Sequence, residues 1–288
     1  MAGTSFGTSA EQDIADFWQH HPCGESLVDA DPADAQAFFD AYDRMRYRLE
    51  AHIPACLDAI GFKGRRTLEI GLGQGADSEQ IIRRGAIWSG IDLTEAAAAR
   101  VRRRLTLRDL PHEQIVVGSA LNLPFPAASQ DIVYSHGVLH HIPDIRTAQS
   151  EIHRVLRPGG LLVAMLYARW SLNYLLAIAV LRRLGLLALL VSGRRPGGIY
   201  DHHVDQAKRE GWHHYLRLRR FIHANTDGPD NPYSKVYDLH RVSEDFPDFT
   251  IAKSYKRFMH APPLPVHGLP GGSIMGWHLW VHLTPRRR

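Results

Sequence analysis

The sequence predicts an α/β fold built around a parallel sheet. Short apolar runs alternate with helical runs between residues 61 and 168, which is the spacing of successive βαβ units. A glycine-rich turn at 71–75 joins the first apolar run to a helical one. The chain has 288 residues, of which 44% are hydrophobic and 22% charged, a composition typical of globular proteins. Global disorder and fibrous repeats are thereby excluded.

Charge and cysteine content narrow the functional classes. The formal net charge is +4, a mild excess that does not by itself indicate a nucleic-acid partner. The two cysteines, Cys23 and Cys56, argue against a disulfide scaffold and fit a reducing compartment. Residues 1–10 lack the basic and apolar regions of a secretory signal. We therefore expect a cytoplasmic protein.

Residues 1–60 predict a helical cap that precedes the sheet. Residues 12–20 carry their apolar side chains on one helical face, and residues 33–60 show helical apolar spacing until Pro54 interrupts it.

Residues 61–168 predict the core of the sheet. Strands are expected at 67–70, 86–93, 113–120, 131–138 and 161–168, and helices at 78–85, 94–105 and 146–156. Thr94 is a suitable N-cap for the second of these helices, and the Arg-Pro-Gly-Gly sequence at 157–160 is a stop signal for the third.

The alternation ends after residue 168. Residues 171–191 are very apolar and nearly long enough to span a membrane, but Arg182 and Arg183 at their centre would be costly in lipid. We expect no transmembrane segment here but a helical hairpin, bent near Gly185. This hairpin could be a lid over the acceptor, a dimer surface or a membrane-surface patch, and we favour the lid or the dimer.

The rest of the chain divides into two further parts. Residues 169–235, which include a second helical stretch at about 201–223, are expected to form a helical insertion that covers the substrate. Residues 236–288 contain two apolar runs, 249–258 and 276–283, which are expected to complete the sheet as its closing strands.

The glycine turn and the end of the next strand suggest a nucleoside-binding site. Gly71, Gly73 and Gly75 let the backbone approach a ligand closely, and the helix that follows offers free N–H groups. Asp92 ends the next strand, where a carboxylate can bond both ribose hydroxyls of an adenosine ligand. The loop also satisfies a nicotinamide-cofactor fingerprint, but Glu69 would repel a pyrophosphate and suits an ammonium group instead.

Four segments in order resemble the motifs of class I S-adenosylmethionine-dependent methyltransferases, in particular the type 11 group similar to ubiquinone and menaquinone biosynthesis enzymes. They are LEIGLGQGADS (68–78), GIDLTEAA (90–97), GSALNLPFPAASQDIVYSHGVLHHIPD (118–144) and EIHRVLRPGGLLVAMLY (151–167). The resemblance implies a Rossmann-like, doubly wound, mostly parallel sheet of seven strands whose last strand, 276–283, is antiparallel. It also implies S-adenosyl-L-methionine as cofactor and S-adenosyl-L-homocysteine as product.

The resemblance further implies which residues hold the cofactor. These are Glu69, Gly71, Gly73 and Gly75 for the methionine part, Asp92 for the ribose, Leu93, Ser119, Ala120 and Leu121 around the adenine, and His136 and Gly137 beside the methyl donor. Ser119 departs from the aspartate that many relatives carry there to bond the adenine amino group.

A sulfonium carries its own activated methyl group, so the protein mainly aligns an acceptor with it. A base is needed only if the acceptor must lose a proton. The candidates near the carboxyl ends of the strands are His136, His140, His141 and Tyr167. From the cap, Tyr42, Arg46 and Tyr47 could close the pocket over a substrate, or they are ordinary helix-face residues.

The sequence thus predicts a methyltransferase that acts on a small, fairly apolar metabolite, such as a secondary metabolite or a quinone-like molecule, by in-line displacement. The alternatives are an RNA or protein acceptor, a cofactor-binding scaffold without catalysis, and a nicotinamide oxidoreductase. We expect no nucleic-acid partner and a possible homodimer through 171–191. Paired histidines such as His202 and His203 point apart on a helix, so we expect no metal.

Overall fold

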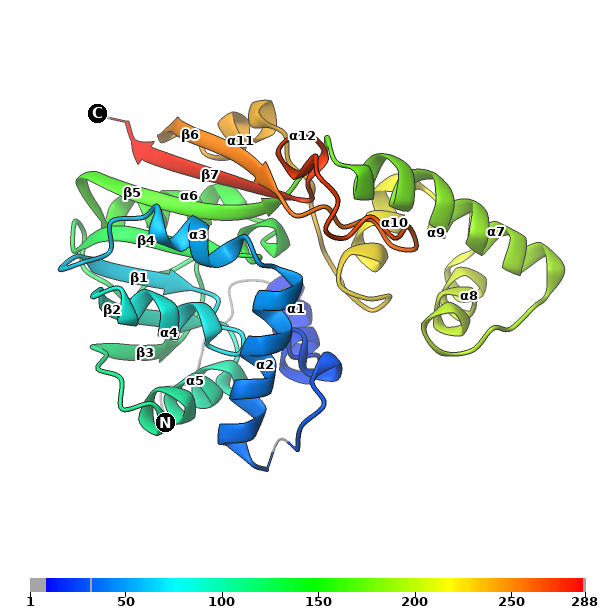
Figure 1. The fold of residues 1–288 in the computed structure, drawn as a ribbon. Coiled ribbons are helices and arrows are strands. Elements are labelled where there is room, and N and C mark those ends of the chain that lie inside the picture. Colours follow the sequence, from blue (N-terminus) through cyan, green and yellow to red (C-terminus); the bar gives the residue numbers. More distant parts are fainter. Residues whose placement is uncertain (1–8, 32, 287–288) are drawn as a thin grey trace.

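Figure 1 shows the fold in the computed structural model, which describes residues 9–31 and 33–286. The strands are β1 Arg66–Ile70, β2 Ile87–Asp92, β3 Gln114–Val117, β4 Gln130–His136, β5 Leu156–Tyr167, β6 Phe249–Arg257 and β7 His278–Pro285. They form one sheet in the order β3-β2-β1-β4-β5-β7-β6. β7 runs antiparallel to both of its neighbours, whereas the pairs from β3 to β5 are parallel. The predicted seven-stranded, doubly wound sheet with an antiparallel last strand is confirmed.

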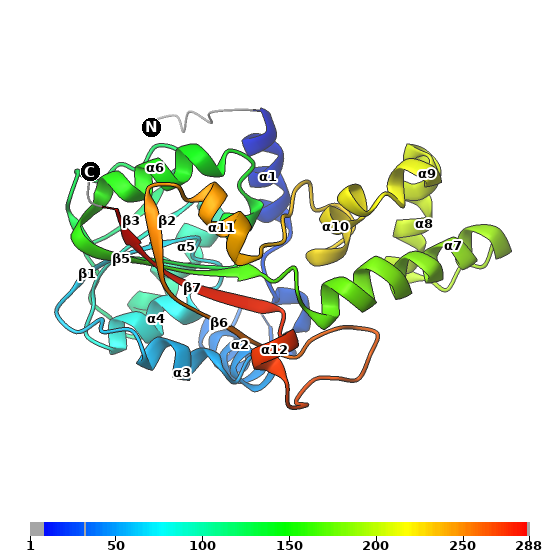
Figure 2. The same ribbon diagram turned by 90° about the horizontal axis from the view of Figure 1, so that it is seen from above.

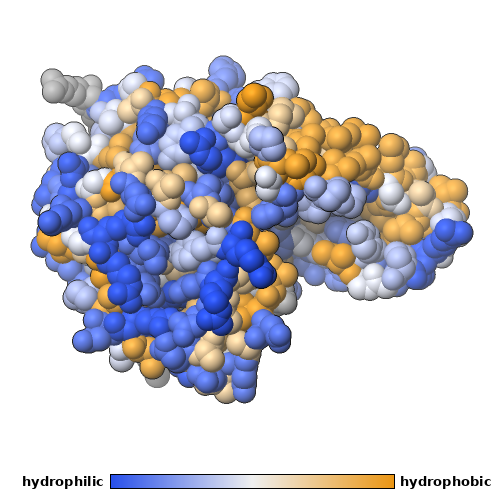
Figure 3. All heavy atoms as spheres, viewed as in Figure 1, coloured by the Kyte–Doolittle hydropathy of each residue, from blue (hydrophilic) through white to orange (hydrophobic). Residues whose placement is uncertain are grey.

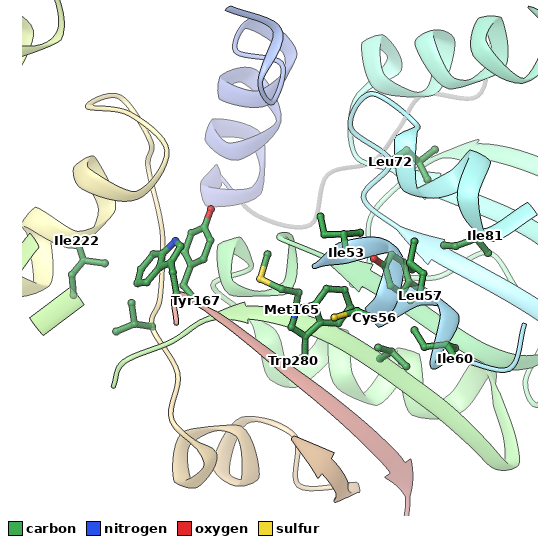
Figure 4. Close-up of a cluster of buried hydrophobic side chains, with 14 of the residues drawn as sticks. Ile53, Cys56, Leu57, Ile60, Leu72, Ile81, Met165, Tyr167, Ile222 and Trp280 are labelled. Atoms are coloured by element: carbon green, nitrogen blue, oxygen red, sulfur yellow. The ribbon is translucent and has the colours of Figure 1, made fainter. Parts of the chain in front are cut away.

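Helices cover both faces of this sheet. They include α3 Ile53–Asp58 and α4 Ala76–Arg83 on one face, and α6 Ile145–Val155 and α11 Leu239–Asp245 on the other (Figure 2). Because successive strand residues point to opposite faces, Tyr134 belongs to the buried cluster under α3 and α4, while Val133 belongs to the cluster under α6. Figure 4 shows the first cluster, where Met165 and Trp280 from the central strands meet Ile53 of α3.

The N-terminal cap is helical, as predicted. It consists of α1 Ser9–His20, a 3-10 turn η1 Glu25–Leu27, and α2 Ala35–Leu49. Helix α2 packs near α5 Glu95–Leu107 of the core, whose N-cap is Thr94 as the sequence indicated. Arg104 of α5 joins the two parts: it is fully buried, donates to Glu79 of α4 at 3.0 Å, and pairs with Asp43 of α2.

Strand β5 begins earlier than the sequence predicted. Gln130 pairs with Leu156 whereas Ile132 pairs with Leu161, so the intervening residues 157–160 bulge out of the strand. Residues 157–160, predicted as the stop signal of the preceding helix, therefore form an irregular part of the strand. Glycine accommodates such a bulge because it adopts the conformations that a bulge requires.

The insertion after β5 is an arm that extends away from the sheet (Figures 1 and 2). Its helices are the π-helix η3 Asn173–Arg182, α7 Arg183–Ser192, α8 Gly198–Glu210, α9 Trp212–Tyr215 and α10 Leu218–Thr226. The chain also has short helices at η2 Leu139–His141 and α12 Gly272–Met275.

The predicted hairpin bent near Gly185 is wrong. η3 and α7 run into one another as one continuous helix of 20 residues, Asn173–Ser192, and Gly185 lies inside α7. The helix ends only at Gly193, which takes a left-handed conformation with φ 68°. Within the described residues this is the one helix long and apolar enough to cross a membrane, so the absence of a transmembrane segment stays a prediction.

The buried Arg104 cluster gives a stability prediction. Replacing Arg104 by methionine leaves the carboxylates of Asp43 and Glu79 without their cation, so we expect Arg104→Met to lower the free energy of unfolding by about 3 kcal/mol. The matched control is Arg102→Met on the same helix, where the ion pair with Glu95 is exposed and the loss should stay below about 0.5 kcal/mol. Denaturant unfolding measures both values, and equal losses would contradict the prediction.

Candidate active site

A cavity of about 410 Å³ opens where four central strands end. Its floor includes Ile70, Asp92, His136 and Tyr167, the residues at or next to the carboxyl ends of β1, β2, β4 and β5. Parallel α/β sheets place their ligands at this edge. The cap closes the cavity from the other side with residues of α1 and α2, namely Ala10, Glu11, Ile14, Trp18, Tyr42 and Arg46.

The glycine turn has the tight geometry that the sequence implied. Gly71 has φ 82°, and a Cβ atom there would come within 2.2 Å of the Val138 side chain. Only glycine fits at this position, where the turn packs tightly against Val138. Gly71 and Gly73 line the cavity, whereas Gly75 lies outside the lining as the N-cap of α4.

Asp92 holds this loop in place. Its Oδ2 accepts from the Leu72 backbone N–H at 2.7 Å, and its Oδ1 accepts from the N–H and the hydroxyl of Thr94 at 2.9 and 2.8 Å. A carboxylate oxygen has two lone pairs, so Oδ2 keeps capacity for a ribose hydroxyl. Asp92 therefore fits a double role as support for the glycine turn and as acceptor for the ligand.

Glu69 is a buried acid in the same wall. It is 2% exposed, and one of its oxygens accepts from the Trp88 indole N–H at 2.9 Å. Burial, together with the nearby charge of Asp77, raises the pKa of Glu69 to about 8. The carboxyl group is therefore mostly protonated at neutral pH, and a cation placed beside it would favour its ionised form.

Ser119 does not line the cavity but is tied to a residue that does. Its hydroxyl donates to the carboxylate of Glu11 from α1, and it accepts from the Leu121 N–H at 2.9 Å. Glu11 lines the cavity beside Ala120 and Leu121, at the edge that the family resemblance assigns to adenine. The cap thus brings a carboxylate close to the position where Ser119 departs from the aspartate of relatives. No feature of the sequence pattern marks this pairing.

A charged network joins the cap to the core at the cavity. Arg46 of α2 donates to both oxygens of Asp77 at 3.1 Å, and Asp77 also accepts from the Tyr134 hydroxyl at 2.9 Å. Burial alone would raise the pKa of Asp77, but the charge of Arg46 outweighs it and holds that pKa below its usual range. Arg46 is thus a cavity residue, as proposed from the sequence, whereas Tyr47 is half-buried and lies outside the lining.

The network fixes the state of His136. Arg46 donates to His136 Nδ1 at 3.1 Å, so Nδ1 carries no proton and the ring proton lies on Nε2. Burial lowers the pKa of His136 to about 3, which keeps the ring neutral. His136 lines the cavity and is suited to donate a hydrogen bond there, not to take up a proton.

A second cluster surrounds His141, which η2 places at the cavity wall. His141 Nδ1 lies 2.8 Å from the Tyr233 carbonyl oxygen, and His141 Nε2 lies 3.4 Å from Asp227 Oδ2. The Tyr167 hydroxyl donates to the other oxygen of Asp227 at 2.7 Å. Asp227 and Tyr233 belong to the loop after α10, and the sequence pattern did not identify either residue.

The other two candidate bases are less suited to proton transfer. Tyr167 lines the cavity, but burial and the neighbouring Asp227 raise its pKa well above the usual range, so its hydroxyl acts as a donor. His140 lies outside the lining, with its ring tilted against that of Tyr167 and the ring centroids 3.8 Å apart. Burial lowers the pKa of His140 well below its usual value, so it stays neutral.

The apolar helix Asn173–Ser192 does not cover the cavity. Among the described lining residues, only Asp227 comes from the stretch 169–235, and it lies after α10. The structure therefore does not support the interpretation of 171–191 as a lid. The described residues also contain no group of three or more histidine, cysteine or acidic side chains that could hold a metal.

Comparison with known proteins identifies the family. A family model described as a methyltransferase domain matches residues 68–164, the stretch that contains the glycine turn, Asp92 and His141. The ubiquinone biosynthesis O-methyltransferase of an Azoarcus species is 29% identical over 228 residues, covering 75% of this chain and 94% of that protein. Residues 68–164 thus form a methyltransferase domain, and the matches support a class I S-adenosylmethionine-dependent methyltransferase of the type 11, quinone-biosynthesis-like kind.

Two further relatives extend the comparison of this methyltransferase. The sterol 24-C-methyltransferase of Gibberella zeae is 31% identical over 128 residues, or 43% of this chain, but the chain spans only 33% of that protein. The solved structure of geranyl diphosphate C-methyltransferase from Streptomyces coelicolor has a TM-score of 0.58 at 16% identity and covers 98% of this chain and 100% of its own. That structural likeness shows the fold. The family matches give S-adenosylmethionine as the cofactor, and a cavity lined by Gly71, Gly73, Asp92 and the buried acid Glu69 fits its chemistry.

The raised pKa of Glu69 gives a prediction for cofactor binding. At neutral pH the folded methyltransferase holds a proton on Glu69, and a cofactor ammonium group bound beside this residue would displace that proton. We expect the affinity for S-adenosylhomocysteine to rise as the pH increases from about 6 to 8, with release of a proton on binding. Titration calorimetry in buffers of different ionisation enthalpy measures that release.

The matched variant is Glu69→Gln, which has a similar shape but no proton to lose at this position. It should bind more weakly than the wild type and lose the proton release. A wild type that binds without releasing a proton would show that the ammonium group does not meet Glu69.

Proposed function

We propose that this protein transfers the methyl group of S-adenosylmethionine to a hydroxyl group of a small, apolar acceptor, with His141 as the base. One observation carries the proposal: the cavity that contains the glycine turn and Asp92 also contains a histidine paired with a carboxylate, His141 with Asp227. A hydroxyl is a weak nucleophile until it loses its proton, so this pair supplies what an oxygen acceptor needs.

The contacts of His141 place the lone pair of its neutral ring on Nε2. A carbonyl oxygen only accepts hydrogen bonds, so the contact with the Tyr233 carbonyl requires the proton to be on Nδ1. The lone pair of the neutral ring is then on Nε2, the atom nearest Asp227. When Nε2 takes up a proton, the resulting imidazolium lies beside a carboxylate that stabilises it.

The proposed step balances without any further reagent. The bound cofactor supplies an activated methyl group and a neutral sulfide as the leaving group. His141 Nε2 takes the hydroxyl proton of the acceptor as the oxygen–carbon bond forms, and Asp227 stabilises the new positive charge. His136 donates its Nε2 proton as a hydrogen bond that helps orient the acceptor. The bound product is S-adenosylhomocysteine.

Apolar side chains in the cavity support a hydrophobic acceptor. They include Trp18, Val138, Ile142 and Met165. The Trp18 ring packs edge-on against the His141 ring, with the ring centroids 5.2 Å apart. Relatives named as acting in ubiquinone biosynthesis or on sterols, and a structure solved with geranyl diphosphate, also favour small apolar acceptors over RNA or protein.

The function is tested by incubating the purified protein with methyl-labelled S-adenosylmethionine and an extract of the source organism. Label in the small-molecule, solvent-extractable fraction is expected, and mass spectrometry then names the acceptor and the methylated atom. Label in the macromolecular fraction would contradict the proposal in favour of an RNA or protein acceptor. Cofactor binding with no label in either fraction would contradict it in favour of a scaffold without catalysis.

The role of His141 is tested with a variant of similar size. His141→Asn removes the base, and we expect it to lower the rate of label transfer by about 100-fold or more while the affinity for S-adenosylhomocysteine stays unchanged. The control is His240→Asn, an exposed histidine far from the cavity lining, which should transfer label at the wild-type rate. A His141→Asn protein with wild-type transfer would show that the acceptor needs no base or uses another one.

A further inference from the structure

The arm has an exposed face made of apolar side chains. Leu175, Leu176, Val180, Leu184 and Val191 of the helix Asn173–Ser192 are 38%, 37%, 39%, 60% and 81% exposed, and we call these five residues the apolar arm face. Figure 3 shows the hydrophobic colouring concentrated over this arm. Only 17% of the helix window is buried, so the protein itself leaves this surface uncovered. An exposed apolar surface of this kind marks an interaction site.

The two charges of the helix are turned away from the apolar arm face. Arg182 donates to the backbone carbonyls of Pro262 and Asn225, both at 2.8 Å, and Arg183 donates to the Leu216 carbonyl at 2.9 Å. The central arginine pair argued against a membrane-spanning helix when only the sequence was considered. In the structure both side chains are used within the protein, so they do not oppose burial of the outer face in an apolar phase.

Aromatic and apolar residues continue the surface at the base of the arm. Trp170 is 54% exposed and precedes the helix, and Ile274 of α12 is 69% exposed. Lys256 holds the two together because its amino group donates to the backbone carbonyls of both. Tryptophan and lysine are the residues that favour the boundary between lipid tails and headgroups.

Charge decides between two possible occupants of this face. Residues 169–223 contain ten arginines and lysines but only three acidic residues, although the whole chain has a net charge of only +4. A second copy of the chain would bring an equally basic arm, and the two would repel. A lipid bilayer with anionic headgroups has an apolar interior and a negative surface. It therefore fits both the apolar arm face and the basic composition of the arm.

We propose that the arm docks on an anionic lipid bilayer, with the apolar arm face buried among the lipid tails and the helix lying along the membrane surface. The inner side of the helix is part of the protein core, where Ile178 packs in the same cluster as Ile222 of α10. A helix that also donates hydrogen bonds to the rest of the arm lies on a membrane and does not cross it. This inference concerns binding alone and does not depend on the proposed methyl transfer.

The test is co-sedimentation of the full-length protein with two kinds of vesicle, equimolar phosphatidylcholine and phosphatidylglycerol, or phosphatidylcholine alone. We expect binding to the anionic vesicles, weakened by added salt, and much less binding to the neutral ones. In the double variant Val180→Asp, Leu184→Asp the apparent affinity should fall by about tenfold or more, because two apolar side chains no longer enter the lipid. The matched control is Leu107→Asp, an exposed leucine at the end of α5, which should bind like the wild type.

Several outcomes would overturn the proposal. One is a wild type that binds neither vesicle, and another is a double variant that binds as well as the wild type while keeping the same melting temperature. Analytical ultracentrifugation without lipid gives a third: a wild-type dimer that the double variant converts to a monomer would assign the face to a second copy. S-adenosylhomocysteine affinity, measured in parallel, shows that a variant that loses vesicle binding still has its cofactor site.

Discussion

The active-site cavity depends on one buried carboxylate, that of Asp77. It lies in the first turn of α4, directly after the glycine turn, and it accepts hydrogen bonds from Arg46 of the cap and Tyr134 of β4. A buried charge is tolerated only when it is paired and bonded, so the cap must stay closed to satisfy it. The same guanidinium sets the tautomer of His136. Closure of the site, ionisation of Asp77 and orientation of a cavity histidine are therefore parts of one network.

The sheet and the glycine turn were predictable because both depend on local sequence. The alternation of apolar runs reports burial on both faces of parallel strands, and Thr94 caps its helix through residues that follow it immediately. Gly71 and Asp92 fall at fixed points next to their strands, where the chemistry of the ligand demands them. These features survive in a single sequence because neighbours along the chain form them.

The pairings that give the site its chemistry were not predictable in the same way. Asp77 with Arg46, Glu11 with Ser119, and Asp227 with His141 join segments far apart in the chain, and no periodic pattern marks them. The apolar stretch at 171–191 likewise shows that composition does not reveal which distant groups contact one another. Its composition left a lid, a dimer surface and a membrane-surface patch open, and only the folded arm shows that Arg182 and Arg183 satisfy backbone carbonyls and leave the apolar residues outside.

The position of Asp227 and Tyr233 has a consequence for how such enzymes diversify. The core residues that we expect to hold the cofactor lie between Glu69 and Gly137, while the groups that orient the proposed base come from a separate stretch after α10. His141 is the point where the two stretches meet. Evolution can therefore exchange the later stretch, and with it the groups that orient the proposed base, while the core around the glycine turn is left intact.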